Sequence, residues 1–232
     1  MARIKRLLGL LGNYDSILSK TVPRTLGPVL MLCIFCSCAK PKAPPDATDK
    51  AMSGLISASK ARKMYSQVEI ATDAVPVPMM KAYIEQHLDY TAYHLLLFLR
   101  HQSPDLYATI NDDDKARVLC SALAESIFMN DWGFLDSDAN GLGEPSEAVA
   151  AKALLDVGKP ALPYLLKLLD DKGTAPMFGS EEATAAAESQ YRRCDFAYRY
   201  VMRIIGRRPC FLSDLLSRDE RISSLQDELV GP

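Results

Sequence analysis

The sequence lacks the clustered basic residues that nucleic-acid binding requires. After residue 60 basic residues are adjacent only in short pairs, among them Arg192-Arg193 and Arg207-Arg208. Because residues 1–37 are basic, the rest of the chain is more acidic than the overall net charge of −2 suggests. Phosphate binding draws its affinity from grouped lysines and arginines. We therefore expect no nucleic-acid partner.

Recognisable catalytic motifs are also missing. The chain has no glycine-rich phosphate loop, no nucleophile elbow and no H-E-x-x-H sequence. Cys120, Cys194 and Cys210 lack CxxC spacing, and three cysteines can form at most one disulfide among themselves. We favour buried small hydrophobes as their role. The protein is expected not to be an enzyme, and the alternative is an enzyme whose site assembles from dispersed residues.

No apolar run is long enough to span a bilayer, which takes about 20 residues. The uncharged run at 26–37 has the length of a signal-peptide core, and Lys20 and Arg24 supply its positive flank. Ser37 then precedes Cys38, and this order resembles a bacterial lipoprotein signal. The resemblance implies lipidation of Cys38 and a membrane-anchored protein of the cell envelope, on its periplasmic or extracellular face. The alternatives are an ordinary cleaved signal and an uncleaved anchor.

Three regions follow from this pattern: a leader at 1–37, a tether rich in Pro, Lys and Ala at 38–50, and a helical domain at 51–232. The tether contains three prolines within its first eight residues, which favours an extended, solvated segment. In the domain, apolar residues recur at helical steps and no alternating run predicts a strand. The predicted fold class is all-α, a compact helical bundle or short HEAT-like array. Helices are expected over 48–73, 79–102, 112–130, 146–157, 161–170 and 180–205, with another starting at Pro104 and a helical tail from Phe211.

One stretch of the domain resembles a HEAT-type repeat, in which two helices join through a tight Gly/Pro turn. The residues that carry the resemblance are Gly158, Pro160, Ala161, Leu162, Pro163 and Leu165. It covers 146–206 at most and shows no second copy at a fixed period. It implies a fold and no chemistry.

The loop from Asp136 to Glu147 fits the calcium-binding pattern D-x-D-x-N-G-x5-E. In that pattern alternate oxygens converge on one ion, a glycine allows the sharp turn, and the final Glu closes the shell. The favoured interpretation is an ordinary polar turn, and bound calcium is the alternative. No other cofactor is expected. The tentative calcium ligands are Asp136, Asp138, Asn140, Leu142, Glu144 and Glu147.

Two further groups of polar residues invite a functional interpretation. His87, His94 and His101 recur every seven residues on one predicted helix, but neighbours about 10 Å apart cannot share one ion. We expect histidines along a packing seam. A second group lies on the predicted helix 180–205, where Glu188–Arg192 and Asp195–Arg199 are expected to be ordinary surface pairs. This group comprises Glu181, Glu182, Arg192, Arg193, Asp195 and Arg199.

These observations favour a membrane-tethered interaction or scaffold protein that binds another protein in a groove between helices. Membrane lipid would contact it through the acylated N-terminus. The alternatives are a calcium-dependent binding module using the loop 136–147, and the enzyme with a dispersed site.

Overall fold

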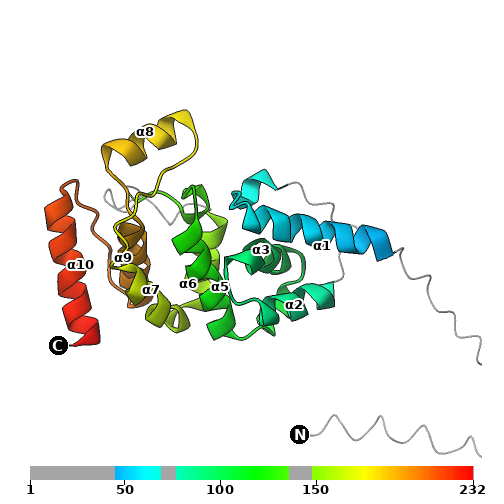
Figure 1. Ribbon diagram of the computed structural model, residues 1–232. Helices are drawn as coiled ribbons and strands as arrows, with labels where there is room; N and C mark the ends of the chain where they lie inside the picture. Colours follow the sequence, from blue (N-terminus) through cyan, green and yellow to red (C-terminus); the bar gives the residue numbers. More distant parts are fainter. Residues whose placement is uncertain (1–44, 69–76, 136–147, 232) are drawn as a thin grey trace, which may run out of the picture. The chain divides into compact units, whose positions relative to one another are not determined.

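The protein's domain is all-helical (Figure 1), as the sequence predicts. The computed structural model describes residues 45–68, 77–135 and 148–231. Within these ranges the only β contact is an isolated antiparallel bridge between Thr174 and Arg192. None of the helices in these ranges is both long and apolar enough to cross a membrane. The described residues belong to one compact unit, Ala43–Pro232. The leader and most of the tether are not among the described residues.

The described ranges contain ten α-helices and four 3-10 turns. The α-helices are α1 (Pro45–Lys60), α2 (Val77–Gln86), α3 (Tyr93–Gln102), α4 (Pro104–Ala108), α5 (Asp112–Glu125), α6 (Val149–Val157), α7 (Leu162–Leu168), α8 (Ser180–Glu188), α9 (Arg193–Ile204) and α10 (Leu215–Val230). The 3-10 turns are η1 (Tyr65–Gln67), η3 (Tyr90–Ala92), η4 (Asn130–Trp132) and η6 (Lys159–Ala161).

Helix α3 is the centre of the first half of the domain. It is apolar on every side, and Leu95, Leu96, Leu97 and Leu99 are all 0 % exposed. A helix that is hydrophobic all round must be covered on all faces. Helices α1, α2, α4, α5 and α6 provide this cover.

Helices α5 and α9 organise the second half. Helix α5 packs against α3, α6 and α7, and α9 packs against α6, α7 and α10. Helix α7 makes its main contacts with α9 and α5, whereas α6 contacts α5 and η4 most. Helix α8 buries only Ala186 and stands apart from the helices below it (Figure 1).

Several predicted helix starts and stops are confirmed. Ser103-Pro104 begins α4, with proline in the first turn where its missing N–H costs nothing. The Asn111 side chain accepts the Asp113 N–H and caps α5, whose first turn carries three aspartates. Gly158 ends α6 with φ of 67°.

Two predicted helices are too long, for one shared reason. The helix predicted over 48–73 ends at Lys60, and the one predicted over 180–205 ends at Glu188. Arg62 and Gln190 follow these ends with φ of 53° and 48°. In both turns the following N–H groups bond back to carbonyls of the last helical turn, as in a Schellman motif. The left-handed position is taken by residues other than glycine, so the usual sequence signal is absent.

The long helix predicted over 79–102 is instead α2 and α3, separated at residues 87–92. The Asp89 side chain accepts hydrogen bonds from the Thr91 N–H and hydroxyl, at 2.8 and 2.5 Å, and thereby starts η3. Helix α5 also ends at Glu125 instead of residue 130.

Candidate functional site

The predicted functional residues of the leader and the acidic loop cannot be placed. Cys38 and the tentative calcium ligands Asp136, Asp138, Asn140, Leu142, Glu144 and Glu147 lie outside the described residues. The chain on either side of the loop is attached to the core. Leu135 is 1 % exposed, and Ala148 packs against the core cluster.

The three histidines do not share a helix face, so that expectation is wrong. The break between α2 and α3 separates His87 from the other two. His87 stacks on Tyr83, His101 is exposed in the last turn of α3, and His94 is buried in its first turn. Only His94 takes part in an internal polar cluster.

His94 joins α3 to α1 through Ser59. The Ser59 hydroxyl lies 2.7 Å from His94 Nδ1, and its oxygen also accepts the backbone N–H of His94 at 3.1 Å. The Ser59 oxygen can accept two hydrogen bonds as well as donate one, so the contact with Nδ1 forms with either neutral tautomer of His94. Burial lowers the pKa of His94 to about 4, although the Met64 and Lys63 carbonyls partly oppose the shift.

Asp131 lies in the same region and anchors the segment after α1. Its Oδ2 accepts the Tyr65 N–H at 2.7 Å and the Tyr93 hydroxyl at 3.0 Å. Burial raises its pKa, and these two hydrogen bonds oppose the shift. Ser59 is only 2 % exposed and His94 0 %. The arrangement therefore suits a clamp between helices better than a nucleophile and its base.

The charged group around α9 is buried and is not the solvent-exposed face expected from the sequence. Asp195 is 3 % exposed, Arg199 2 % and Arg192 8 %. The break at Gln190 moves Arg192 out of any helical pairing with Glu188. Glu181, by contrast, is exposed in the first turn of α8.

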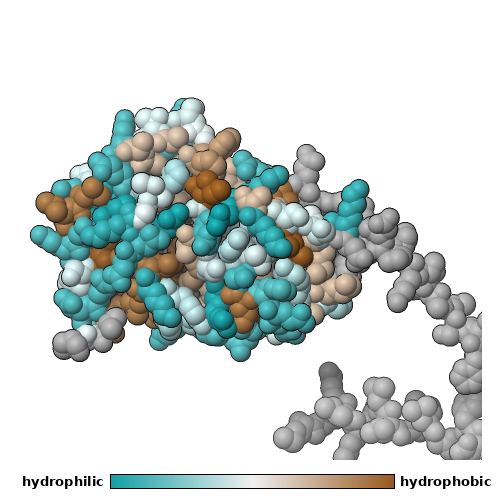
Figure 2. All heavy atoms as spheres, viewed as in Figure 1, coloured by the Kyte–Doolittle hydropathy of each residue, from teal (hydrophilic) through white to brown (hydrophobic). Residues whose placement is uncertain are grey.

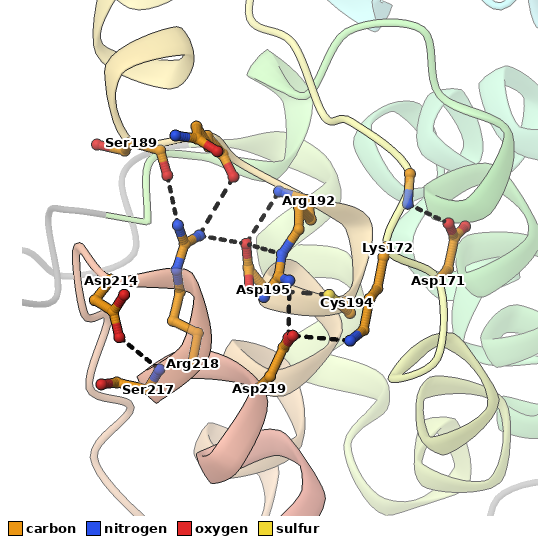
Figure 3. A network of polar contacts seen from close by, with 12 residues as sticks. Asp171, Lys172, Ser189, Arg192, Cys194, Asp195, Asp214, Ser217, Arg218 and Asp219 are labelled. Carbon is orange, nitrogen blue, oxygen red and sulfur yellow. Dashed lines mark hydrogen bonds and ion pairs between the residues drawn. The ribbon is translucent and has the colours of Figure 1, made fainter.

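Asp195 is the centre of this ion network (Figure 3). It accepts the backbone N–H of Arg192 at 3.0 Å, Arg192 Nη2 at 3.0 Å and Arg218 Nη1 at 2.6 Å. The first of these contacts, with Arg192 at the N-cap, forms part of a capping box for α9. Arg192 also pairs with Asp219 at 2.7 Å, and Asp219 with Lys172 at 2.8 Å.

Arg218 extends the network from α10 to the turn after α8. Its Nη2 donates to the Ser189 carbonyl at 2.7 Å, and its guanidinium lies 4.6 Å from the centre of the Phe211 ring. The hydrogen bond from Lys172 and the contact with Arg192 lower the pKa of Asp219. With both oxygens of Asp195 engaged, the network fixes α8, α9 and α10 to one another. Its α10 residues and Lys172 are remote in sequence from α9, and no local spacing signals them.

The expectation of buried cysteines holds for Cys120 and Cys194 and is wrong for Cys210. Cys120 and Cys194 are buried and Cys210 is exposed, and all three are free thiols. Burial raises the pKa of Cys120 and of Cys194 to about 12, so both remain protonated at neutral pH. A protonated thiol is a poor nucleophile and packs as a small hydrophobe.

An open groove lies between α5 and α7. Its volume is about 260 Å³. On α5 its lining follows helical spacing, with Arg117, Cys120, Ser121 and Ala124 on one face. Tyr164, Lys167 and Leu168 line it from α7, and Leu88 completes it. Arg117 and Lys167 are exposed, whereas the lining is apolar at Leu88, Cys120 and Leu168.

Comparisons with known protein families, with curated proteins and with solved structures found no match.

Proposed function

We propose that the helical domain is a protein-interaction module that binds a helical, acidic segment of another protein in the groove between α5 and α7. The observation that carries the proposal is an apolar groove floor with two cations beside it. An amphipathic helix in such a groove buries its apolar residues and places its charged ones at the edge. The opposite charge of Arg117 and Lys167 selects acidic residues at those positions.

The surface elsewhere favours a small recessed site over a broad apolar face. On the side shown in Figure 2 most residues are hydrophilic, and hydrophobic residues form separate patches. Among the described residues the exposed large hydrophobics are spread over several elements, and the two that share α10 are thirteen positions apart: Met79, Ile127, Phe178, Leu216 and Leu229. Scattered single residues of this kind are normal on a protein surface and need no binding partner to explain them.

Selection from a displayed library of helical peptides tests the proposal. The whole protein should enrich peptides with leucine or phenylalanine at helical spacing and Asp or Glu beside them. Arg117→Glu together with Lys167→Glu should remove this enrichment, whereas Lys159→Glu, at an exposed lysine outside the groove lining, should preserve it. Selection of basic peptides, or enrichment that the groove variant leaves intact, would contradict the proposal.

Membrane tethering through an acylated Cys38 is the second part of the proposal, and the leader sequence supports it. The HEAT-like turn at Gly158–Pro163 adds support for an interaction role, because helical repeats of this type present binding surfaces. Growth of the producing cells with an alkyne-tagged fatty acid should label the protein. Cys38→Ala should abolish the label, and a labelled Cys38→Ala protein would overturn the assignment.

A further inference from the structure

A second open groove lies between the end of α6 and the end of α9, and three arginines line it. Its volume is about 470 Å³, and it shares no lining residue with the α5–α7 groove. The three cations are Arg203, in the last turn of α9, and Arg207 and Arg208, which follow this helix. None of the described residues that line the groove is acidic, so the charge of its lining is positive.

The turn after α9 brings these arginines together. Gly206 has φ of 76° and reverses the chain, and its N–H donates to the Arg203 carbonyl at 3.0 Å. The Arg207 N–H donates to the Met202 carbonyl at 2.8 Å, which completes a Schellman motif. The backbone itself therefore satisfies these carbonyls, and the Arg208 guanidinium is not needed to cap the helix.

Arg207 and Arg208 are the cations that a ligand can reach. Arg208 is exposed, and no carboxylate within the described ranges pairs with it. Arg207 is also exposed, and both of its terminal nitrogens donate to Glu228 of α10, which is not part of the groove lining. A guanidinium has five N–H donors, so this pair orients Arg207 and leaves it able to donate to a ligand as well.

We propose that this groove binds a phosphate monoester. Such a group carries roughly two negative charges at neutral pH and three oxygens, so it can engage more than one guanidinium. A carboxylate carries a single charge, and one arginine already satisfies it in a bidentate pair. The phosphate contacts Arg207 and Arg208.

The apolar part of the lining receives the organic body of the ester. Leu155 of α6 and Ile204 of α9 are half-buried and pack against the core, so they form a fixed apolar surface beside the arginines. Inorganic phosphate would leave this surface without a partner. Both a soluble ester and a lipid headgroup present the required chemistry, a phosphate beside an apolar body.

Titration of the whole protein with phenyl phosphate, followed by amide chemical shifts, tests this site. Benzoate carries one charge on the same ring, and benzyl alcohol is the neutral probe. We expect saturable binding of phenyl phosphate with a dissociation constant on the order of 1 mM, given the size of the probe. The shifts should centre on Gly158, Ile204 and Gly206. Benzoate should bind at least about fivefold more weakly, because it engages fewer guanidinium donors, and benzyl alcohol should cause no comparable response.

Arg208→Gln should weaken phenyl phosphate binding about fivefold, because a bidentate ion pair at an exposed site contributes at the upper end of the range for exposed pairs. Its unfolding midpoint should stay that of the wild type, since no carboxylate within the described ranges loses a partner. Arg117→Gln is the matched control, at an exposed arginine of the α5–α7 groove. Unchanged binding by Arg208→Gln, an equal loss in Arg117→Gln, or equal binding of phenyl phosphate and benzoate would each overturn the proposal.

Sedimentation with vesicles distinguishes the two sources of the phosphate. The whole protein with Cys38→Ala, which removes the proposed acyl anchor, is mixed with phosphatidylcholine vesicles with or without phosphatidic acid, whose headgroup is a phosphate monoester. If the ligand is a lipid, phosphatidic acid should increase the bound fraction, and Arg208→Gln should reverse this increase. If it is a soluble ester, Arg208→Gln should weaken phenyl phosphate binding alone. Loss of neither ligand in Arg208→Gln would overturn the proposal.

Discussion

Ser59 of α1 both caps α3 and hydrogen-bonds the buried ring of His94. Its oxygen accepts the His94 backbone N–H at the start of α3, where the N-cap position Ala92 has no side chain to do so. Its hydroxyl lies 2.7 Å from His94 Nδ1. One residue of α1 thus satisfies two buried polar groups of α3.

Acid should weaken the fold through His94. Its pKa is about 4 in the folded protein and about 6.5 when unfolded. Folding therefore favours neutral His94. The contribution of this group to the free energy of unfolding is fully present above pH 6.5 and declines as the pH falls toward 4. The expected loss is about 2 kcal/mol by pH 5. Urea unfolding at pH 7, 6 and 5 measures it.

His94→Asn isolates the histidine from other groups that titrate in this range. Asp131 lies nearby with a raised pKa, so its protonation stabilises the fold as the pH falls and opposes the effect of His94. We expect the variant to be less stable at pH 7 but to lose less stability than the wild type between pH 7 and 5. Parallel losses in the two proteins would show that His94 does not control this dependence.

The buried ion network should respond strongly to removal of its central charge. Asp195→Asn leaves the buried Arg218 without its carboxylate partner, while Arg192 keeps Asp219, and an unpaired buried charge typically costs about 3–5 kcal/mol. Asp156→Asn is the comparison, because Asp156 pairs with Arg100 at an exposed site and should cost no more than about 1 kcal/mol. Similar unfolding midpoints for the two variants would contradict the structural role of Asp195.

Gln190→Gly should stabilise the protein by about 0.5–1 kcal/mol. Gln190 is exposed and has φ of 48°, a conformation that disfavours side chains with a Cβ atom. Glycine removes this strain at the end of α8. The neighbouring Ser189→Gly should instead destabilise, since Ser189 has φ of −82° and glycine only adds freedom to the unfolded chain. Thermal unfolding of both variants distinguishes the two cases.

Calcium binding by the loop 136–147 stays a prediction from its sequence. If Asp136, Asp138 and Glu147 bind the ion, calorimetry should show saturable calcium binding with a dissociation constant on the order of 0.1–1 mM. Glu147→Gln removes the residue expected to close the shell and should abolish the heat. Absence of heat with wild-type protein at several millimolar calcium would leave the polar-turn interpretation in place.

The sequence predicts those features of the fold that have local signals. Pro104, Asn111 and Gly158 mark helix boundaries because their side chains or backbone conformations act within a turn. Arg62 and Gln190 end helices equally well but occupy left-handed positions without glycine. Their helix ends depend on contacts of the folded domain, and periodicity alone continues through them.

The polar clusters were beyond prediction for a related reason. Asp195 looks like half of a surface pair because its true partner, Arg218, lies on another helix. Ser59 and His94 are likewise joined only when α1 packs on α3. Residue type and spacing report neighbours along one helix, whereas these contacts depend on which helices pack together.

The proposed interaction through the α5–α7 groove is tested most directly by a charge exchange. Arg117→Glu with Lys167→Glu should weaken binding of a selected acidic helical peptide on the order of tenfold, as expected when two charge pairs at the rim become repulsive. The same peptide with lysines in place of the facing acidic residues should bind this variant better than it binds the wild type. Restored affinity between the doubly substituted protein and the lysine-substituted peptide would place the peptide in the groove. Equal affinity of the two proteins for both peptides would contradict the account.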